Sequence, residues 1–233
     1  MNQGPISPAS PPCPLCGAVA SGEAITAYGR SLHQCATCDL IFVIAAEHIP
    51  VEQERCRYTL HKNTIDNTGY VARFERLMAM VFQLSGGPKR VLDFGCGPGP
   101  VLVELLRRRG HDASGYDPYF APDTNLSRAY DIVFCTEAAE HFRRPRDSVA
   151  KLVSLVAPGG TLAVMTSLHP GAKLISQWWY IRDETHVSFY SLRTFEWIAR
   201  HCGFTLEATD GKEIVILRRT LTDGGNPTKI GPE

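Results

Sequence analysis

The chain has 233 residues, 44% of them hydrophobic, and its 24 basic side chains are balanced by 24 acidic ones. This length suits one medium-sized domain with a small appended module, and the zero net charge excludes a general attraction to nucleic acid, so such a partner would need a local basic patch. Since no apolar run approaches the roughly 20 residues that cross a bilayer, and the Pro- and Ser-rich start lacks a secretory signal pattern, we expect a cytoplasmic protein without a membrane contact.

The amino-terminal part divides into a leader and a cysteine-rich module. Residues 1–12 contain too little apolar surface to offset the entropy of ordering, which predicts a disordered leader. Two C-x-x-C pairs follow, formed by Cys13, Cys16, Cys35 and Cys38. Four thiolates at this spacing can bind Zn²⁺ tetrahedrally, and a reducing compartment favours metal over disulfides. We predict a structural zinc ribbon over 13–44, closed by a strand at 40–44, with four free thiols as the alternative.

The centre of the sequence is a strand, a glycine-rich loop and a helix. The apolar run 90–94 precedes glycines at every second position, and residues 101–109 place their apolar side chains on one face. The glycines permit positive φ angles and a close approach of a ligand to the backbone. Dinucleotide-binding folds use a similar loop with the spacing G-x-G-x-x-G. Here the spacing is G-x-G-x-G, and the preceding Asp93 would repel a pyrophosphate but can accept hydrogen bonds from an ammonium group.

This segment, VLDFGCGPG, resembles motif I of the class I S-adenosylmethionine (SAM)-dependent methyltransferases, whose pattern is close to V-L-D-x-G-C-G-x-G. The resemblance covers residues 89–219 and implies an α/β fold with a Rossmann-like, seven-stranded sheet that binds SAM. The cofactor-binding residues that it implies in the loop are Asp93, Phe94, Gly95, Cys96, Gly97 and Gly99. A glycine turn with a purely structural role is the alternative.

A second acidic residue, Asp117, ends the predicted strand 113–117. It can accept hydrogen bonds from both hydroxyls of a ribose, as in other nucleoside-binding βαβ units. A helix cap or a loop acid is the alternative. Only twelve residues separate Asp117 from the next predicted strand, 130–136. Most members of the superfamily have room there for a further helix and strand, so we expect a sheet that is shortened at this edge.

The second half of the domain continues with helices and strands in alternation. The predicted elements are a helix from 145 to 156, a turn at 157–160, a strand at 161–166, a helix that Ser191 caps and Gly203 ends, and strands at 204–208 and 213–217. The polar tail, 220–233, is expected to be flexible.

Residues 45–88 are predicted to form a mostly helical lid or linker, in two pieces that part around 63–69. In the methyltransferases that this chain resembles, the segment before motif I tends to cover the SAM pocket. Tyr58 and His61 are therefore candidates for a lid, with an ordinary solvated helix face as the alternative.

Two carboxylates and an imidazole follow the strand 130–136. If a helix begins there, Glu137, Glu140 and His141 fall within one turn and can share a face. Such a cluster can bind a divalent cation, and acids that only cap the helix are the alternative. Glu137 is also a candidate cofactor contact.

The pairing of E-x-x-E-H with a later loop histidine resembles the metal site of the small-RNA 2′-O-methyltransferases and is similar to the ubiquinone-biosynthesis O-methyltransferases. On that resemblance Mg²⁺ or Zn²⁺ would be bound by Glu137, Glu140, His141 and His186. The cation would anchor vicinal hydroxyls and lower the pKa of the attacking one. Without a cation, His186 or His141 would serve as the catalytic base.

The function that these features predict is O-methylation of a small hydroxylated acceptor. The aromatic stretch around His186 supplies candidate pocket walls or ordinary core, namely Trp178, Trp179, Tyr180, Phe189 and Tyr190. An RNA or protein methyltransferase that uses the ribbon for recognition is one alternative, although the basic runs 107–109 and 143–146 are more typical of solvated helix ends. A SAM-binding module without catalysis is another.

Overall fold

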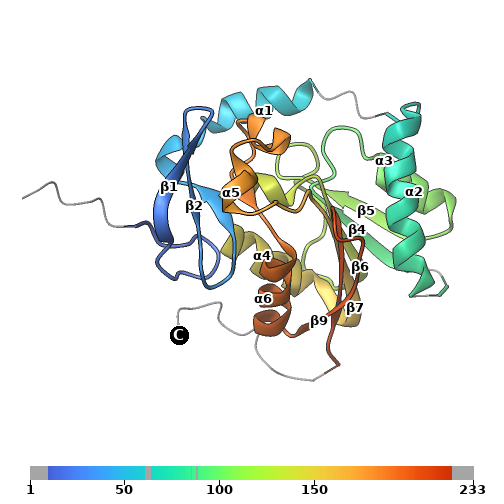
Figure 1. Cartoon of the computed structure of the whole chain (residues 1–233). Helices are drawn as coiled ribbons and strands as arrows, with labels where there is room; N and C mark the ends of the chain where they lie inside the picture. Colours follow the sequence, from blue (N-terminus) through green and yellow to red (C-terminus); the bar gives the residue numbers. More distant parts are fainter. Residues whose placement is uncertain (1–9, 61–63, 85, 88, 222–233) are drawn as a thin grey trace, which may run out of the picture.

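Two sheets organise the molecule (Figure 1): a six-stranded sheet with helices on both faces, and a four-stranded sheet that is built mainly from amino-terminal residues. The computed structural model describes residues 10–60, 64–84, 86–87 and 89–221. The start of the predicted leader, His61 and the predicted tail from residue 222 lie outside the described residues. None of the described helices is long and apolar enough to cross a membrane.

The six-stranded sheet has the order β5-β4-β6-β7-β10-β9. Its strands are β4 (Arg90–Phe94), β5 (Asp112–Tyr116), β6 (Tyr130–Thr136), β7 (Val156–Met165), β9 (Phe204–Thr209) and β10 (Ile214–Arg219). Strands β5, β4, β6 and β7 are parallel, whereas β10 lies antiparallel between β7 and β9. The carboxyl ends of the parallel strands therefore meet at one edge of the sheet, where ligands bind in open α/β folds.

Helices cover both faces of this sheet. The helices are α1 (Val51–Thr59), α2 (Thr68–Gln83), α3 (Val101–Arg108), α4 (Pro145–Leu155), α5 (Ala172–Ile175) and α6 (Leu192–Cys202), with short 3-10 turns η1 (Ala45–Glu47), η2 (Ala139–His141) and η3 (Trp179–Arg182). Because successive strand residues face opposite sides, Val133 packs in one core with α4 and α6, while its neighbour Ile132 packs in the other with α2 and α3. Both sides of the sheet are thus closed to water.

The predicted shortening of the sheet is confirmed. Strand β5 is the edge strand, and the twelve residues after Asp117 contain no further helix or strand. The sheet has six strands in place of the seven that the resemblance implies. The predicted turn at 157–160 forms part of β7, where the register with β6 shifts between Val156 and Thr161.

The predicted boundaries of α6 are confirmed in detail. The Ser191 side chain accepts a hydrogen bond from the backbone N–H of Thr194, and the Thr194 hydroxyl accepts one from the backbone N–H of Ser191. This reciprocal cap satisfies two amides at the helix start. Gly203 ends the helix with a φ of 71°, a left-handed conformation that glycine adopts without strain.

The four-stranded sheet joins the ribbon to the second half of the chain. Its order is β1 (Ser21–Ala27), β2 (Arg30–Gln34), β3 (Ile41–Val43) and β8 (Ser188–Phe189). Strand β3 matches the predicted closing strand, but its other edge pairs with β8. A small core unites the two parts, with Leu32 of the ribbon beside Ile181. In Figure 1 the orange segment that contains α5 accordingly lies next to the blue hairpin.

Candidate active site

The glycine loop follows β4 and is held against β5. The backbone N–H groups of Gly95 and Cys96 both donate to the carbonyl of Tyr116, at 2.7 and 3.1 Å. Gly95 has a φ of 88°, and a Cβ there would lie 2.6 Å from the Cβ of Ala138. Gly97 also has a positive φ, of 64°, but a Cβ there would meet no atom within 4 Å. The loop is therefore tight on its inner side and open at Gly97, as a ligand cradle requires.

The other predicted loop residues surround this cradle. Phe94 packs against Tyr116, with 5.0 Å between the ring centroids. Cys96 is half-buried, and burial raises the pKa of its thiol to about 12, so it stays protonated at neutral pH. The Gly99 carbonyl accepts a hydrogen bond from Val101 at the start of α3. The structure thus brings together all the residues that the motif predicts in the loop.

Asp93 is a buried carboxylate with an unused acceptor. Its side chain is 3% exposed, and its Oδ1 atom has no hydrogen-bond partner among the described residues. Burial, helped by the nearby charge of Asp117, raises its pKa to about 7. A buried acceptor without a donor is costly, and such groups are rare in folded proteins. Asp93 therefore carries a buried acceptor that none of the described residues satisfies.

Asp117, in contrast, is largely satisfied by the backbone. Its Oδ1 accepts hydrogen bonds from the N–H groups of Tyr119 and Phe120, at 2.8 and 3.2 Å. Its Oδ2 accepts one from Gly97, at 3.1 Å. A carboxylate has about four acceptor positions, so one remains. Asp117 therefore shapes the glycine loop through Gly97, and these contacts leave one of its acceptor positions unused.

A second cluster of polar groups lies beyond the end of β6. One ligand atom each from Glu140, His141 and His186 lies within 4.8 Å of the other two. Glu140 is 1% exposed; its Oε1 accepts a hydrogen bond from the Tyr180 hydroxyl at 2.5 Å, and its Oε2 has no partner among the described residues. Burial raises the pKa of Glu140. The structure thus brings His186 from a distant loop to the turn η2 that carries the other two residues.

Both imidazoles are oriented by backbone carbonyls. The Nδ1 atom of His141 lies 3.1 Å from the carbonyl oxygen of Thr185, and that of His186 lies 2.8 Å from the carbonyl of Tyr180. A carbonyl only accepts, so each Nδ1 carries the proton and each Nε2 keeps its lone pair. Burial lowers the pKa of both histidines, that of His186 to about 3. The cluster therefore combines two neutral imidazoles with a buried carboxylate.

The fourth predicted ligand, Glu137, lies outside this group. Its carboxylate accepts two hydrogen bonds from Arg73 of α2, at 2.9 and 3.3 Å. Arg73 also pairs with Glu213, at 2.8 Å. Sequence reasoning missed Arg73, since no motif surrounds it and its partners lie 64 and 140 residues away. Glu137 therefore belongs to an ion-pair network with Arg73 and Glu213, beyond the end of β6.

Helix α1 covers the histidine cluster. The ring of Tyr58 packs edge-on against His141, with 5.1 Å between centroids, and its hydroxyl donates to Glu54 at 2.6 Å. Glu54 is 5% exposed and pairs with Arg143 at 2.7 Å. Arg57 on the same helix pairs with Asp183 of the loop that carries His186, at 3.2 Å. These contacts fasten the helix against His141 and the loop of Asp183, and the lid role of Tyr58 stays a prediction.

The aromatic stretch before α6 serves mostly as core. Tyr180, Phe189 and Tyr190 are between 1% and 3% exposed, whereas Trp179 is 61% exposed. The hydroxyl of Tyr180 donates a hydrogen bond to Glu140 of the cluster. Most of this stretch is therefore core, and only Tyr180 among these residues has a ring contact with His186, at 4.3 Å between centroids.

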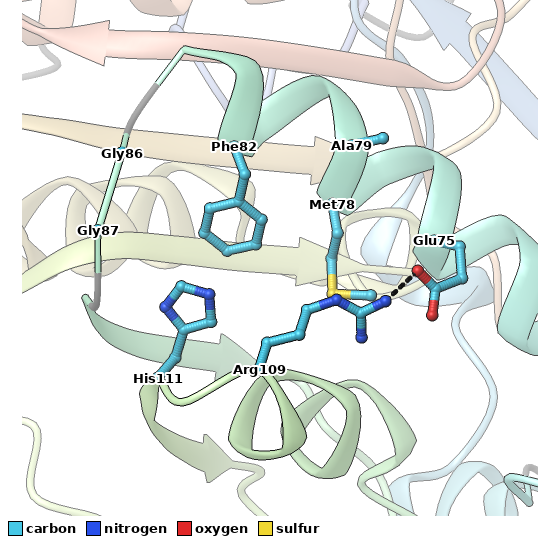
Figure 2. A pocket seen from close by; sticks show the side chains of 8 residues that line it. All are labelled: Glu75, Met78, Ala79, Phe82, Gly86, Gly87, Arg109 and His111. Atoms are coloured by element: carbon cyan, nitrogen blue, oxygen red, sulfur yellow. Dashed lines mark hydrogen bonds and ion pairs between the residues drawn. The ribbon is translucent and has the colours of Figure 1, made fainter.

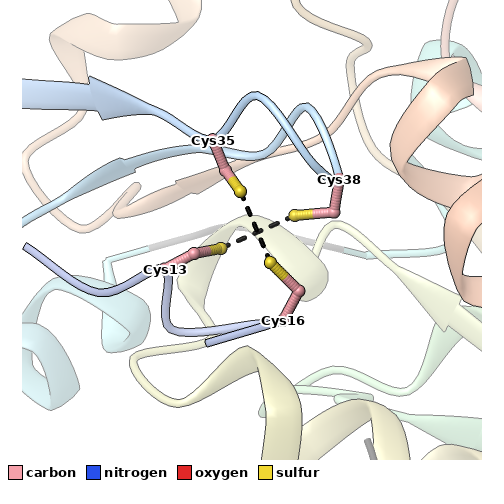
Figure 3. Close-up of side chains that lie close together, drawn as sticks. All are labelled: Cys13, Cys16, Cys35 and Cys38. Atoms are coloured by element: carbon pink, nitrogen blue, oxygen red, sulfur yellow. Dashed lines mark hydrogen bonds between the residues drawn. The ribbon is translucent and has the colours of Figure 1, made fainter. Parts of the chain in front are cut away.

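The four ribbon cysteines form a separate, closed cluster (Figure 3). Their sulfurs all lie within 4.8 Å of one another, with Cys13 3.5 Å from Cys38 and Cys16 3.4 Å from Cys35. Sulfurs at the usual 2.3 Å from one zinc ion are about 3.8 Å apart. All four are buried. The arrangement fits the predicted tetrahedral site, with no position open to a substrate.

A cavity of about 610 Å³ lies elsewhere (Figure 2). It is lined by residues of α2, by Gly86 and Gly87 before β4, and by Arg109 and His111 before β5. Phe82 stacks on His111, with 4.4 Å between centroids, and Arg109 pairs with Glu75. This cavity opens at the amino ends of the strands, so it lies apart from the glycine loop and the histidine cluster.

The arginines of the two basic runs pair with other groups of the same chain. Arg108 pairs with Glu104, Arg109 with Glu75, Arg143 with Glu54 and Arg144 with Asp147. Arg107 and Arg146 donate to backbone carbonyls. Each run therefore has partners of its own and does not form a row of free cations.

Comparison with known proteins decides the family. A model described as a methyltransferase domain matches residues 69–209, which is more than half of the chain. The chain belongs to the methyltransferase domain family. The matched range begins in α2, includes the glycine loop and Asp117, and ends with β9.

Curated relatives of this methyltransferase-domain chain match it in part. It is 35% identical over 107 residues to the ubiquinone biosynthesis O-methyltransferase of Photorhabdus laumondii, a match that covers 34% of this chain and 44% of that protein. It is 27% identical over 143 residues to the enzyme of the same name from Saccharophagus degradans, covering 41% and 60%. The chain thus spans roughly half the length of the curated relatives it matches.

Among solved structures, the 1,6-didemethyltoxoflavin-N1-methyltransferase of Burkholderia thailandensis superimposes with a TM-score of 0.51. The match covers 85% of this chain and 100% of that one, at 12% sequence identity. At this identity the likeness shows the fold alone, and it confirms the Rossmann-like methyltransferase architecture.

Proposed function

We propose that this methyltransferase-domain protein transfers the methyl group of SAM to an oxygen of a small hydroxylated acceptor. The observation that carries the proposal is the unpaired Oδ1 of Asp93, because a buried acceptor beside a glycine loop calls for a donor that the described chain does not supply. The names of the curated relatives support the acceptor class, since both are ubiquinone biosynthesis O-methyltransferases. The structural neighbour was solved with S-adenosylhomocysteine bound.

The residues in and around the glycine loop fit the cofactor. Asp93 would accept a hydrogen bond from the ammonium group, which a carboxylate recognises strongly in a buried site. The open space at Gly97 admits a ligand against the backbone. Asp117 would use its remaining acceptor position for a ribose hydroxyl, and Phe94, Cys96 and Gly99 complete the loop. Glu137, with Arg73, would contribute to the wall of the cofactor site. When bound, SAM supplies a methyl group on a sulfonium.

Glu140, His141 and His186 would hold a divalent cation on the acceptor side. Because Arg73 neutralises Glu137, the remaining donors are two imidazole nitrogens and one carboxylate. This set suits Zn²⁺ better than Mg²⁺, which prefers oxygen ligands. The fixed Nδ1 contacts and the Tyr180 hydroxyl on Glu140 are the kind of supporting interactions that orient metal ligands. A cation there lowers the pKa of a coordinated hydroxyl.

The chain's own residues would orient the acceptor and handle its proton. Methyl transfer needs the acceptor oxygen in line with the breaking bond, and α1 closes the site over His141 with the ring of Tyr58. Tyr119 lies next to Tyr58, at 6.2 Å between centroids, and offers a further aromatic surface. The free Nε2 atoms of the two histidines are the groups that could accept the acceptor's proton in the absence of a cation.

Zinc would also occupy the cysteine cluster, as a structural ion. The buried sulfurs and their spacing support this assignment. The alternative of an RNA or protein acceptor gains no comparable support, because the basic runs are paired within the chain.

The proposal is tested in two stages. Calorimetry with SAM and with S-adenosylhomocysteine should show binding of both, and failure of both would leave the enzyme assignment without support. Methyl transfer to a panel of catechols and phenols should then be lost after mild chelation and restored by Zn²⁺, with elemental analysis showing that the ribbon zinc is retained. Full activity in the chelated protein, or in His186→Ala, would reject the cation while leaving SAM binding intact.

A further inference from the structure

The ribbon reaches the histidine cluster through Arg30, the first residue of β2. Arg30 is 8% exposed, and its guanidinium donates to the carbonyl of His186 at 2.8 Å and to that of Glu184 at 3.3 Å. It also donates to the carbonyl of Ile181. Burying a guanidinium is unfavourable unless its donors are satisfied. The three carbonyls therefore fix both the arginine and the path of the loop 181–186.

The backbone of this loop orients both imidazoles. The carbonyl of Thr185 accepts the Nδ1–H of His141, and the His186 ring is held by the carbonyl of Tyr180, the residue before the loop. The backbone carbonyls of Thr185 and Tyr180 thus fix the orientation of both rings, which lie with Glu140 in one cluster. A shift of the loop would change the geometry of all three donors at once.

A second connection runs from the ribbon strand β3. The N–H of Val43 donates to the carbonyl of Val187, and the N–H of Val187 donates to the carbonyl of Glu140, each at 2.9 Å. The ribbon, the loop and the turn η2 are therefore linked by consecutive backbone hydrogen bonds. Arg30 and Val43 hold the same loop from two neighbouring strands.

We propose that Arg30 is a positioning residue that holds His186 and His141 against Glu140, and that the ribbon is an internal scaffold of the acceptor side of the site. The inference rests on the proposed function only in taking these three side chains as the working groups. It differs from the view of the ribbon as a module that recognises a macromolecule. An arginine suits this role because its planar fork can donate to several carbonyls at once, whereas a lysine ammonium is a single point donor.

Two variants of Arg30 and one control test the proposal in the full chain. Arg30→Met keeps the apolar stem and removes every donor, and Arg30→Lys keeps the charge. Arg182→Met is the matched control, because Arg182 is exposed and joins the same loop to the ribbon hairpin only through the Tyr28 hydroxyl, at 3.2 Å, and ring. The control should behave as wild type in every measurement.

Hydrogen exchange is the first measurement. Arg30→Met should raise exchange at least tenfold in peptides that contain 181–187 and 139–142, with no change around the glycine loop. Arg30→Lys should fall between Arg30→Met and wild type. If Arg30→Met does not fold, Arg30→Lys decides: faster exchange confined to these peptides supports the proposal. Wild-type exchange in the folded variant overturns it.

Binding of Mn²⁺, followed by the loss of the free-ion EPR signal, is the second measurement, since Mn²⁺ does not displace zinc from four thiolates. Arg30→Met should bind Mn²⁺ about tenfold to 100-fold more weakly, as for other groups that orient metal ligands, while its affinity for S-adenosylhomocysteine stays within twofold of wild type. Equal Mn²⁺ affinity in Arg30→Met and wild type would overturn the role of Arg30. If wild-type protein binds no Mn²⁺, the exchange result alone decides the role of Arg30, and restoration of methyl transfer by Zn²⁺ decides the cation.

Discussion

The buried thiols of the ribbon have partners within one cluster, whereas two buried carboxylates near the carboxyl ends of the parallel strands are incompletely paired by the described residues. In the ribbon, four buried thiols lie together and can all serve one ion. Near the carboxyl ends of the parallel strands, Asp93 and Glu140 each keep a buried oxygen without a hydrogen-bond partner among the described residues. The ribbon cluster forms a complete ligand set for one ion, whereas Asp93 and Glu140 each keep an acceptor oxygen that no described residue satisfies.

This difference distinguishes side chains that stabilise the fold from side chains whose burial lowers stability. A closed ligand set contributes free energy of folding when it binds its ion. Unpaired buried carboxylates lower stability and are retained where a ligand uses them.

Cys35→Ser should abolish folding of the ribbon. Structural zinc in small domains contributes on the order of 10 kcal/mol, which is comparable to the whole stability of a typical domain. Because Cys35 lies in the same core as α4 and α6, we expect the loss to spread to the six-stranded sheet. The zinc content measured by elemental analysis should fall well below about one ion per chain, and the yield of soluble protein should drop sharply.

Cys56→Ser is the matched control for this prediction. Cys56 lies on α1 and is exposed, so its loss should change neither the zinc content nor the melting temperature. A folded Cys35→Ser protein without zinc would contradict the structural assignment of the ribbon.

Asp93→Asn should stabilise the unliganded protein at high pH. Burial raises the pKa of Asp93 from 3.8 to about 7, so between these values the folded state binds more protons than the unfolded state. Stability conferred by the protonated form is therefore lost as the pH rises from about 4 to 7, by up to about 4 kcal/mol. Asparagine carries no charge, so urea unfolding should show a gain at pH 8 and none near pH 4.

The same substitution should weaken cofactor binding. Removing one partner of a buried charge pair costs several kcal/mol, so we expect about 100-fold lower affinity for S-adenosylhomocysteine. In wild-type protein this affinity should rise as the pH increases through 7, because the ammonium requires ionised Asp93. Unchanged calorimetric affinity in Asp93→Asn would separate this carboxylate from the cofactor.

Glu140→Gln should reduce metal-stimulated methyl transfer about 100-fold without loss of stability. Glutamine keeps the shape of the side chain and can still accept from the Tyr180 hydroxyl. The neutral amide also removes a carboxylate whose burial raises its pKa, so unfolding should not become easier. Glu75→Gln, in the ion pair with Arg109 beside the distant cavity, is the control and should leave transfer unchanged. A large fall in melting temperature would instead make Glu140 a structural residue.

The predictable parts of this molecule are those whose signals are local. The cysteine pairs, the glycine loop and the Ser191 cap are each written within a few neighbouring residues, and the structure contains all three. The shortened sheet edge followed from the length of one connection. Spacing and turn chemistry determine these features, so one sequence is enough to find them.

The parts that sequence could not provide depend on distant contacts. Arg73 removes Glu137 from the expected cation ligands through a pair that spans 64 residues. Arg30 donates to backbone carbonyls of a loop about 150 residues away. Because every residue has such a carbonyl, no sequence pattern indicates this contact. The addition of β8 to the ribbon sheet is similar, because two residues carry no recognisable strand signal. Such contacts follow from tertiary packing, which decides local choices that the sequence leaves open.

Ser191→Ala should have the smallest effect and tests how the two regions are joined. The Ser191 hydroxyl caps α6 and donates to Asp39 of the ribbon at 2.6 Å. Losing a cap costs about 1 kcal/mol, or roughly 3 °C for a chain of this size. Ser154→Ala, exposed near the end of α4, is the control and should cost much less. If the two regions unfold as one unit, as their shared core implies, Ser191→Ala should lower a single melting transition; a second transition, with zinc released first, would show that the ribbon folds independently.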